Sequence, residues 1–513
     1  MPRGEKTPGA RQDRHEGWGK HIYAVKFRFD DEYHVLSRQE LDSIHAASLE
    51  ILRDVGVHIP NARVLEMAAG EGGDVDQAAQ IVRFPPDVIE GHLERRREGA
   101  RRVRREAGRY RGVLSDAGAG EPAQPHQVKG DVGGLCTMAW DMDLERTRPA
   151  TCEDLRAGTR IANHLECVRR YTPMFTPSDV PEGTNDLHVW ALAFLNSSKD
   201  PTGGYILRRS SVAPLHDMAV AYAGSEAEVR RRGLFGYLCF LASPLRFQAD
   251  ALEIALEVHD LGYPVHVGMP MVVAGATGPQ TLAGTLTLGN AETLAGWVLS
   301  SAFNTETDYG AAAVTMDPAT GVACYADPRR TLLAAAALDF ARYYGLPMAG
   351  AHLSHTDAAA PGMQAGAERV MGALVNVLLG IAPTSIRIGI LGPSGMTGCL
   401  PQMFIDGEIC SMLNALFRGI EVDEERIALD LIKRVGIGGT FLDQEHTAAH
   451  LRSELWFPTL FLREHFNEGG EQVLERAKAR VREVLAEPEP HPLPEHKERE
   501  IRRILERAIG AAG

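Results

Sequence analysis

The sequence contains no long apolar run and little cysteine, and each shortage excludes a class of protein. No stretch reaches the roughly 18 consecutive apolar residues that a membrane-spanning helix needs. The first twenty residues lack an apolar core and therefore do not form a secretory signal. The chain has seven cysteines in 513 residues and no CxxC pair. This pattern excludes a disulfide framework or a zinc ribbon and predicts reduced thiols in the cytoplasm.

Positive charge is also in short supply, because the formal net charge is −14 at pH 7. A surface of that sign repels phosphate groups, so nucleic acid is excluded as the main partner. One segment has the opposite balance, since Leu93–Arg111 holds nine arginines and three glutamates. Two interpretations stay open for it: a solvated helix, or a docking surface for an acidic protein.

From about residue 130 onwards, strand-like runs alternate with stretches of helical length. The eight strand-like runs are Val132–Trp140, Arg170–Thr176, Gly203–Leu207, Phe235–Leu241, Val265–Val272, Tyr309–Thr315, Met348–Leu353 and Ser385–Leu391. Helical stretches between them include 151–164, 246–261, 277–301, 329–345 and 362–380. Strict alternation is typical of a parallel sheet with right-handed crossovers, and eight units favour a closed barrel. We therefore expect an α/β protein built on a (β/α)8 TIM-type barrel.

Segments outside this alternation predict additions to the barrel. We expect disorder at 1–33, a helical extension at 34–129, the barrel at 130–420, and a C-terminal helical lobe and tail at 421–513. In the extension, Ser37 and Glu40 have the spacing of a capping box, which predicts a helix over 37–55. The tail 471–509 predicts exposed helices on both sides of a Pro-rich bend.

The residues at the predicted strand ends are rich in aromatic and Met side chains and poor in carboxylates. Barrel chemistry takes place at this end, yet no carboxylate pair suited to glycoside hydrolysis is apparent. GPSG at 392–395 lacks the lysine of a phosphate-binding P-loop. Aromatic ring faces hold a quaternary ammonium best, at roughly 0.5–2 kcal/mol per ring. Candidate substrate-binding residues are Trp140, Phe175, Tyr205, Phe240, Met269, Tyr309 and Thr315. For each ring, ordinary core packing is the alternative.

Histidines supply the candidate catalytic groups. His352 and His355 lie in AGAHLSHTD, where either could act as an acid–base group or contact a substrate. As zinc ligands they would need a third partner, for which Cys324 is the only distant candidate. This leaves open a metal-dependent lyase or hydrolase, although we expect no metal. A second set, in which His446, His450 and Glu454 share one helix face, predicts a structural role.

A series of short segments carries a resemblance over most of the chain. They are LDSIHAASLEILRDVGVHI near the start, FLNSSKDP (194–201), SPLRF (243–247), MPMVVAGATGPQTLAG (269–284), MDPATG (316–321), ARYYGLP (341–347), FRGIEVD (417–423) and GIGGTFLDQEHTAAHLRSELWFP (436–458). In this order they resemble the successive blocks of the trimethylamine methyltransferase family.

The resemblance implies a barrel with an electropositive or neutral central cavity. It also implies methyl transfer from a methylated amine to the Co(I) of a corrinoid carried by a separate small protein, so this chain itself binds no cofactor tightly. Members with pyrrolysine act on trimethylamine, and that residue belongs to the block that reads MAGAHLSHTD here, at 348–357. Without pyrrolysine, this chain is similar to members that demethylate quaternary amines such as glycine betaine.

Such a reaction would depend mainly on positioning, because a quaternary nitrogen already carries the charge that makes its methyl group transferable. The ammonium would lie among rings and Met side chains. Arg208 is a candidate for binding a substrate carboxylate, with a surface arginine as the alternative. The expected partners are the amine, a small corrinoid protein and possible further copies of this chain, with neither nucleic acid nor membrane. A non-catalytic, ligand-binding relative stays open as another function.

Overall fold

The structure is a computed structural model that describes most of the chain. The described residues are 34–107, 128–202, 205–310, 312–346, 353–379, 384–418, 420–461, 463, 472–488 and 493–512. Residues 1–33, where we expect disorder, lie outside them. No helix within the described residues is both long and apolar enough to span a membrane.

Helices and strands follow one another along most of the described chain. The helices are α1 Arg38–Asp54, α2 Ala62–Gly70, α3 Pro86–Ala107, α4 Cys152–His164, α5 Asn185–Asn196, α6 Val212–Ala223, α7 Glu226–Arg232, α8 Ala249–Asp260, α9 Leu282–Ala302, α10 Pro328–Tyr344, α11 Met363–Leu378, α12 Leu400–Phe417, α13 Glu424–Ile427, α14 Leu429–Val435, α15 Glu445–Glu454, α16 Val473–Ala486 and α17 Glu495–Ala512. The strands are β1 Val57–His58, β2 Asp74–Asp76, β3 Ile81–Arg83, β4 Val128–Asp131, β5 Met138–Asp141, β6 Arg146–Pro149, β7 Tyr237–Cys239, β8 Val265–Val267, β9 Met271–Val273, β10 Ala312–Asp317, β11 Val322–Cys324, β12 Leu353–Ser354, β13 Thr384–Arg387, β14 Ile390–Leu391 and β15 Thr397–Gly398.

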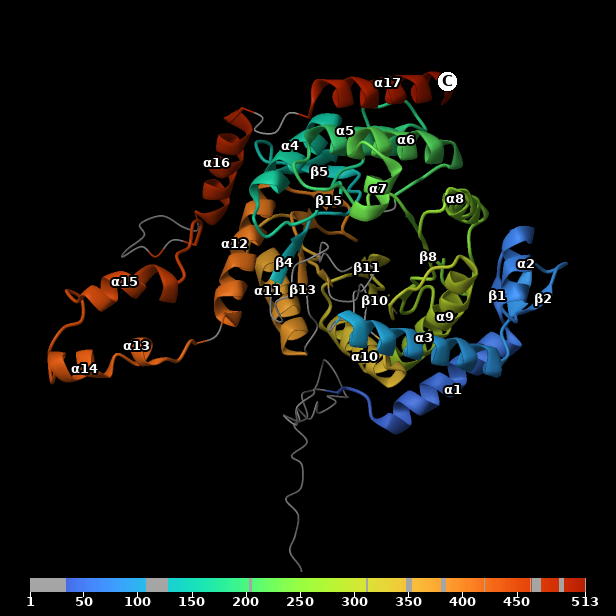
Figure 1. Cartoon of the computed structure of the whole chain (residues 1–513), viewed down its shortest axis with the longest axis horizontal. Coiled ribbons are helices and arrows are strands. Elements are labelled where there is room, and N and C mark those ends of the chain that lie inside the picture. Colours follow the sequence, from blue (N-terminus) through green and yellow to red (C-terminus); the bar gives the residue numbers. More distant parts are fainter. Residues whose placement is uncertain are drawn as a thin grey trace, which may run out of the picture.

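The main body has strands in the middle and helices around them, as Figure 1 shows. The first helices, α1 to α3, lie along one side, and α17 crosses the outer face of α5 and α6. Helices α13 to α15 project away from the body beyond α12. The alternating helices and strands confirm the predicted mixed α/β class.

Parallel pairing links strands that are far apart in the sequence. β4 pairs with β13, and β13 pairs with β12, all in parallel. β7 pairs with β8, and β9 with β10, again in parallel. Isolated parallel bridges join Gly130 to Val168 and Tyr171 to Pro201. The named strands form five separate small sheets, and within the described residues these do not make one closed ring.

Local sequence signals explain where several elements begin. The Ser37 hydroxyl accepts a hydrogen bond from the Glu40 backbone, and the Glu40 carboxylate accepts one in return from the Ser37 backbone. This capping box confirms the predicted start of α1. The two predicted tail helices are confirmed as α16 and α17, on either side of the Pro-rich segment. Their predicted full exposure is wrong, because Val481 of α16 and Ile501 of α17 are buried against the body. Arg96 and Arg97 of the Arg-rich segment donate to backbone carbonyls of the body, whereas side chains from residue 101 to 111 lie outside the described part.

One predicted strand is shortened and another is divided in the structure, and the backbone explains why. The run 132–140 contains only β5, because Leu135 adopts a left-handed conformation with φ 51° between β4 and β5. The run 385–391 is divided into β13 and β14 by Gly389, whose φ is +72° and whose N–H is bound by the Asp406 carboxylate. A left-handed residue cannot continue a strand, so the first strand begins later than predicted, at Met138, and the second is interrupted after Arg387.

Close backbone packing fixes α9 against the strands. Gly268 follows β8 with a φ of +86°, and a Cβ atom there would lie 2.2 Å from the Cα of Gly296 in α9. Only glycine permits both the conformation and the approach. Most of the long helix α9 is buried, and its outer side is covered by α1.

Candidate active site

A group of polar side chains lies at the carboxyl ends of the paired strands β4, β12 and β13. We call it the strand-end cluster and define it by Asp131, Tyr325, Arg330, His355 and Arg387. Asp131 and Arg387 are the last residues of β4 and β13 and are partners in the parallel register. Their side chains form an ion pair of 3.0 Å, and Arg387 also donates to the Gly133 carbonyl.

The aromatic part of the cluster follows β11 and β12. His355 comes directly after β12, and its ring centroid lies 4.9 Å from that of Tyr325. Tyr325 is held by its backbone N–H, which donates to the Asp357 carboxylate at 2.7 Å. Its hydroxyl lies 4.0 Å from the sulfur of Met271, a half-exposed side chain.

Arg330 of α10 completes the cluster. Its guanidinium donates to the Tyr325 carbonyl at 3.1 Å, and its Cζ atom lies 5.6 Å from the centre of the Tyr325 ring. Burial lowers the pKa of Arg330 to about 10, so the group stays protonated at neutral pH. A permanent positive charge therefore lies beside two aromatic rings.

The electrostatic field at His355 is positive. Burial lowers its pKa well below the ordinary range, and the charges of Arg330, Arg387 and Arg369 lower it further. The imidazole is therefore neutral at pH 7. Burial also raises the pKa of Tyr205, which responds to the charges of Arg387 and Asp131. Burial is the main reason that this histidine stays neutral, and the nearby arginines that add to the effect would favour an anion such as a carboxylate.

A buried ion pair lies next to the strand-end cluster and contacts the end of β12. Arg369 of α11 and Asp406 of α12 are 0% exposed, and their Nε and Oδ1 atoms are 2.8 Å apart. Arg369 also donates to the Ser354 carbonyl at the end of β12, next to His355. Burial raises the pKa of Asp406 to about 6, which leaves the carboxylate ionised at neutral pH. The ion pair therefore joins α11 to α12, and the bond from Arg369 to Ser354 joins both helices to β12.

Comparisons with known proteins agree with one another. Residues 4–509 match the family described as trimethylamine methyltransferase (MTTB). The chain belongs to the trimethylamine methyltransferase family. This membership confirms the predicted family and the predicted enzyme class, a methyltransferase.

Individual relatives are similar over most of their length. The trimethylamine methyltransferase MttB of Methanosarcina thermophila is 29% identical over 81% of this chain and 84% of the relative. The MttB of Desulfitobacterium hafniense strain DCB-2 is 28% identical over 92% and 93%. A glycine betaine methyltransferase of Desulfitobacterium hafniense strain Y51 is 27% identical over 89% and 93%. The crystal structure of the Methanosarcina barkeri monomethylamine methyltransferase superposes with a TM-score of 0.41 at 11% identity, covering 90% of both chains.

The structure places the predicted site residues in different surroundings. His355 and Tyr205 lie in or beside the strand-end cluster, whereas His352 lies outside the described residues. Trp140 packs against a small apolar group with Ala358, Leu391 and Cys399, and Phe175 is fully buried in the main core. Among the described residues, no ring contact joins two of the predicted rings. Their role in substrate binding stays a prediction.

The remaining predicted residues differ in exposure. Tyr309 is fully buried and donates to the Asn290 side chain at 3.0 Å. Thr315 is buried and donates to Asp327, which caps α10. Phe240 is 48% exposed after β7, and Met269 is half-buried between β8 and β9. Arg208 is exposed in a separate hollow of about 510 Å³, whose lining includes three carboxylates.

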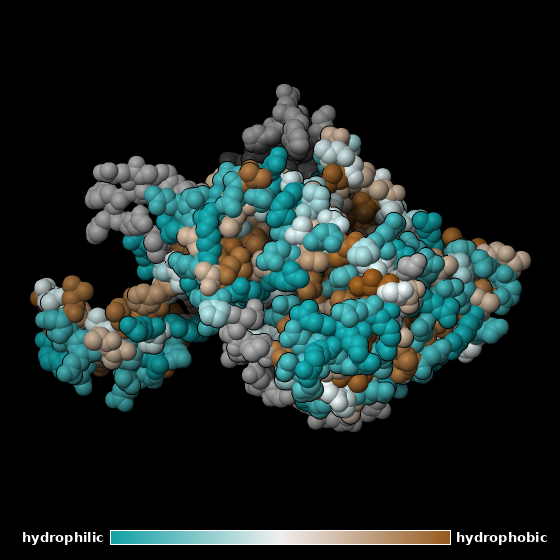
Figure 2. All heavy atoms as spheres, turned by 90° about the horizontal axis from the view of Figure 1, so that it is seen from above, coloured by the Kyte–Doolittle hydropathy of each residue, from teal (hydrophilic) through white to brown (hydrophobic). Residues whose placement is uncertain are grey.

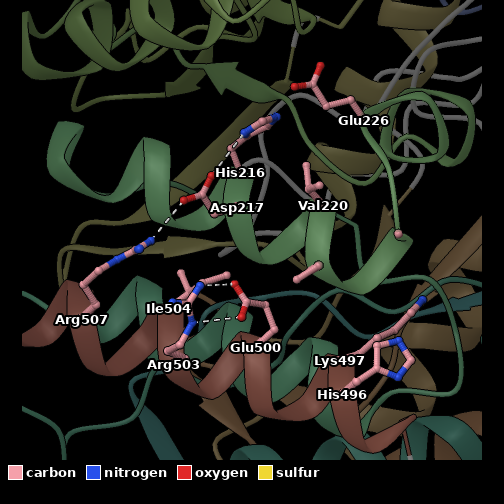
Figure 3. Close-up of a pocket in the computed structure, with 12 residues that line it drawn as sticks. His216, Asp217, Val220, Glu226, His496, Lys497, Glu500, Arg503, Ile504 and Arg507 are labelled. Atoms are coloured by element: carbon pink, nitrogen blue, oxygen red, sulfur yellow. Dashed lines mark hydrogen bonds and ion pairs between the residues drawn. The ribbon is translucent and has the colours of Figure 1, made fainter.

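Two further hollows show where space is available. His355, Tyr325 and Arg330 border one of only about 20 Å³ between α10 and α11, enough for about one water. A larger one of about 620 Å³ lies between α6 and α17, on the outside of the body. Figure 3 shows that two of its carboxylates already face cations: Glu500 pairs with Arg503, and Asp217 with Arg507. The charged groups of these pairs therefore already compensate one another in the larger hollow.

Sequence reasoning missed both arginines of the strand-end cluster, and a signal for one was present. Arg387 is the single charge inside the apolar run SIRIGIL, where a charged side chain is costly unless it has a partner or a function. Arg330 carries no comparable signal, because arginine is common in the first turn of a helix. No group of three or more potential metal-binding side chains is found in the described residues, which do not include His352.

Proposed function

We propose that this chain transfers a methyl group from a quaternary amine that also carries a carboxylate to the Co(I) of a corrinoid protein. The observation that carries the proposal is the placement of three arginines around His355: Arg330 binds the Tyr325 carbonyl, Arg387 ends β13 beside Asp131, and Arg369 binds the Ser354 carbonyl. A trimethylammonium group without a counter-charge would be repelled there. A betaine brings its own carboxylate, which compensates the arginines.

The hollow at His355 has only about 20 Å³, so the cluster side chains must move apart for a substrate to bind there. The substrate would then lie with its two charged ends in different surroundings. Its carboxylate would bind at Arg330 and Arg387, because guanidinium groups match carboxylate geometry with paired hydrogen bonds. Its ammonium would lie toward the Tyr325 and Tyr205 rings and the Met271 sulfur, which attract a cation without needing a hydrogen bond from it. This assigns the carboxylate to the strand-end cluster instead of to Arg208.

The chemistry then needs orientation more than acid–base groups. The C–N bond breaks, its electron pair stays on nitrogen, and a neutral tertiary amine remains. The methyl acceptor is the electron-rich Co(I) of a corrinoid, which a separate small protein would carry to the strand ends. Holding donor and acceptor in line is the main contribution of the chain. The neutral His355 would help to fix the carboxylate end of the substrate without adding charge.

We also propose that the strands close into a complete (β/α)8 barrel. The pairing of β4 with β13 supports closure, because it joins the first parallel strand to the last. Parallel pairs or bridges also link 130 with 168, 171 with 201, β7 with β8, β9 with β10, and β12 with β13. In a barrel, the strand-end cluster would lie at the mouth where such enzymes carry out their chemistry.

A substrate panel tests the proposed reaction. The purified chain is mixed with chemically reduced cob(I)alamin, which removes the need for an identified protein partner, and methyl–Co(III) absorbance is followed. We expect methyl transfer from glycine betaine or a longer betaine, and much slower transfer from choline and trimethylamine. Absence of transfer from every betaine, repeated with a small corrinoid protein, would contradict the proposal.

Comparison of charge variants tests the carboxylate assignment separately. Arg387→Gln removes one cationic end of the cluster, whereas Arg208→Gln removes an exposed arginine outside it. We expect the first variant to lose affinity for betaine and the second to keep it. The opposite result would assign the carboxylate to the Arg208 hollow.

A further inference from the structure

Two cysteines lie beside strand β4, one on α12 and one in the loop that follows α4. Cys410 lies on α12, one turn before Asn414, whose side-chain amide donates to the Val128 carbonyl at 2.9 Å and accepts from the Val128 N–H at 2.7 Å. The Cys167 carbonyl accepts a hydrogen bond from the Gly130 N–H at 2.9 Å. A Cβ atom on Gly130 would lie only 3.0 Å from the Cys167 sulfur. Both cysteines therefore lie beside the same short stretch of β4, which packs on α12.

The two thiols are hydrogen-bonded to each other and differ in their ionisation. The Cys410 thiol donates to the Cys167 sulfur, which lowers the pKa of Cys167 and raises that of Cys410. The positive charge of Lys199 also lowers the pKa of Cys167, whereas burial opposes the shift. The Lys199 ammonium is held nearby, because it donates to the Ala162 carbonyl at 2.6 Å and the Leu165 carbonyl at 2.7 Å, where α4 ends. Cys167 is therefore the thiol that ionises first.

The two thiols also differ in their access to solvent. Cys167 is half-buried, whereas Cys410 is fully buried within the main hydrophobic core. Apolar side chains of the body gather in that core, and the face drawn in Figure 2 is mainly hydrophilic. A small oxidant therefore reaches Cys167 first and finds Cys410 directly behind it. An ionised, accessible thiol next to a second thiol is the usual arrangement of redox-sensing cysteines.

We propose that Cys167 and Cys410 form a dithiol that hydrogen peroxide converts reversibly into a disulfide. The Cys167 thiolate attacks one peroxide oxygen and the O–O bond breaks, so that Cys167 becomes a sulfenic acid and the other oxygen leaves as hydroxide, which takes a proton from the solvent. Cys410 then attacks the Cys167 sulfur, the S–O bond breaks, and a second water leaves with the Cys410 proton. The two thiols lose two electrons, the peroxide is reduced to two waters, and a dithiol reductant reverses the change.

The disulfide would displace α12. Its sulfur atoms must lie about 2.05 Å apart, closer than any hydrogen-bonded pair of atoms, so Cys410 moves toward Cys167. A close-packed interior transmits such a displacement. Asp406 lies one turn before Cys410 on α12, where its carboxylate accepts from the Gly389 N–H at 2.7 Å and pairs with Arg369 at 2.8 Å. Oxidation therefore weakens the contacts of α12 with α11 and with the turn after β13.

These contacts link the dithiol to the strand-end cluster, and this link rests on the proposed function. Arg369 donates to the Ser354 carbonyl next to His355, so a displaced α12 disturbs the site at which a betaine would bind. A displacement of about 1 Å can cost on the order of 100-fold, so we expect the oxidised chain to bind a betaine roughly 10–100-fold more weakly. Hydrogen peroxide also oxidises Co(I). The chain would thus release its substrate under the conditions that remove the methyl acceptor.

Peptide mapping of the full chain tests the disulfide without any reaction assay. The wild type is treated with hydrogen peroxide, digested without reductant and analysed by mass spectrometry. We expect a linked pair of peptides that contain Cys167 and Cys410, two hydrogen atoms lighter than the separate peptides, which dithiothreitol separates. In Cys410→Ser the Cys167 sulfenic acid has no second thiol and should be trapped by dimedone. Peroxide-treated wild type without this linkage would overturn the proposal.

Hydrogen exchange tests the displacement of α12. The Gly389 amide, which Asp406 binds, should exchange faster in the oxidised wild type than in the reduced one, and peroxide should not change its rate in Cys410→Ser. A linked chain with unchanged exchange at Gly389 would overturn the effect on α12. Calorimetry then compares betaine binding by the oxidised and reduced wild type. A reduced chain that binds no betaine contradicts the proposed function, whereas the mapping and exchange results decide the dithiol by themselves.

Two variants serve as matched controls. Cys152→Ser removes a half-buried thiol outside the pair and should keep both the linkage and the change in exchange. Loss of the linkage in this variant would show that Cys152 takes part, and the proposal would fail. Lys199→Gln keeps an amide that can donate to the carbonyls at the end of α4 but removes the positive charge, so the linkage should form several-fold more slowly. An unchanged rate would overturn the role of Lys199.

Discussion

Glu292 links pH to stability in a way that can be worked out from its contacts. It lies on α9, is 0% exposed, and accepts hydrogen bonds from the Ser243 hydroxyl at 2.6 Å and the Leu245 backbone at 2.7 Å. Burial raises its pKa from 4.5 to about 7. Ionising it in the folded protein therefore costs about 3 kcal/mol more than in the unfolded chain. Because the pKa of Glu292 is higher in the folded protein than in the unfolded chain, the protonated side chain favours the folded state. This contribution to the free energy of unfolding is fully present below pH 4.5 and is lost as the pH rises through 7.

The variant Glu292→Gln isolates this effect. The glutamine oxygen can accept from Leu245 and its amide can donate to Ser243, so the loop keeps its contacts without a titrating group. Urea unfolding between pH 5 and pH 8 should show the wild type losing roughly 2–3 kcal/mol relative to the variant. Other buried groups, such as His266, titrate in both proteins and cancel. Glu50→Gln, at an exposed residue of α1, is the control and should leave the profile unchanged. Parallel profiles for wild type and Glu292→Gln would refute the reasoning.

Three further predictions follow from the same geometry. Arg387→Gln should raise the KM for a betaine by roughly 30–150-fold, equivalent to about 2–3 kcal/mol, in the cob(I)alamin assay; an unchanged KM would separate Arg387 from the substrate. Asp406→Asn leaves Arg369 buried without its counter-charge and should cost about 3–5 kcal/mol in urea unfolding; a loss below 1 kcal/mol would contradict the role of the pair. In thermal unfolding, Gly268→Ala should lower the free energy of unfolding by more than about 3 kcal/mol, because the new Cβ atom would overlap Gly296. The control Gly70→Ala, at a position with open space around it, should change the free energy of unfolding by no more than about 1 kcal/mol.

Sequence patterns predicted helices better than they predicted strands. A capping box such as Ser37 with Glu40 lies within one turn, so four residues are enough to place a helix start. The end of a strand depends on a single backbone conformation, such as that of Gly389, and on a carboxylate from Asp406, seventeen residues away. For that reason the expected eighth strand continued past Arg387 to Leu391, and Arg387 was not recognised as a residue at a strand end.

The candidate site could be predicted only in part for a related reason. Periodicity marks an aromatic ring as inward-facing, but it does not distinguish a ring that lines a cavity from one that fills the core. Tyr309 can be fully buried because its hydroxyl donates a hydrogen bond to the side chain of Asn290, nineteen residues earlier. The ordered family blocks predicted the enzyme class, since they need no knowledge of which side chains meet. The effect of the Arg387 charge on His355 depends on the β12–β13 register, which sequence spacing does not reveal.

The pairing of β4 with β13 also affects how the chain is made. Val128 is the register partner of Thr384, which follows it 256 residues later in the chain. At about 5–20 residues per second, ribosomes need roughly 13–50 s to make the intervening segment. During that interval one edge of β4 has no partner, and an unpaired strand edge is a template for association with other chains. We therefore expect nascent chains that stop before residue 384 to aggregate, and folding in the cell to depend on chaperones that shield the N-terminal half until synthesis is complete.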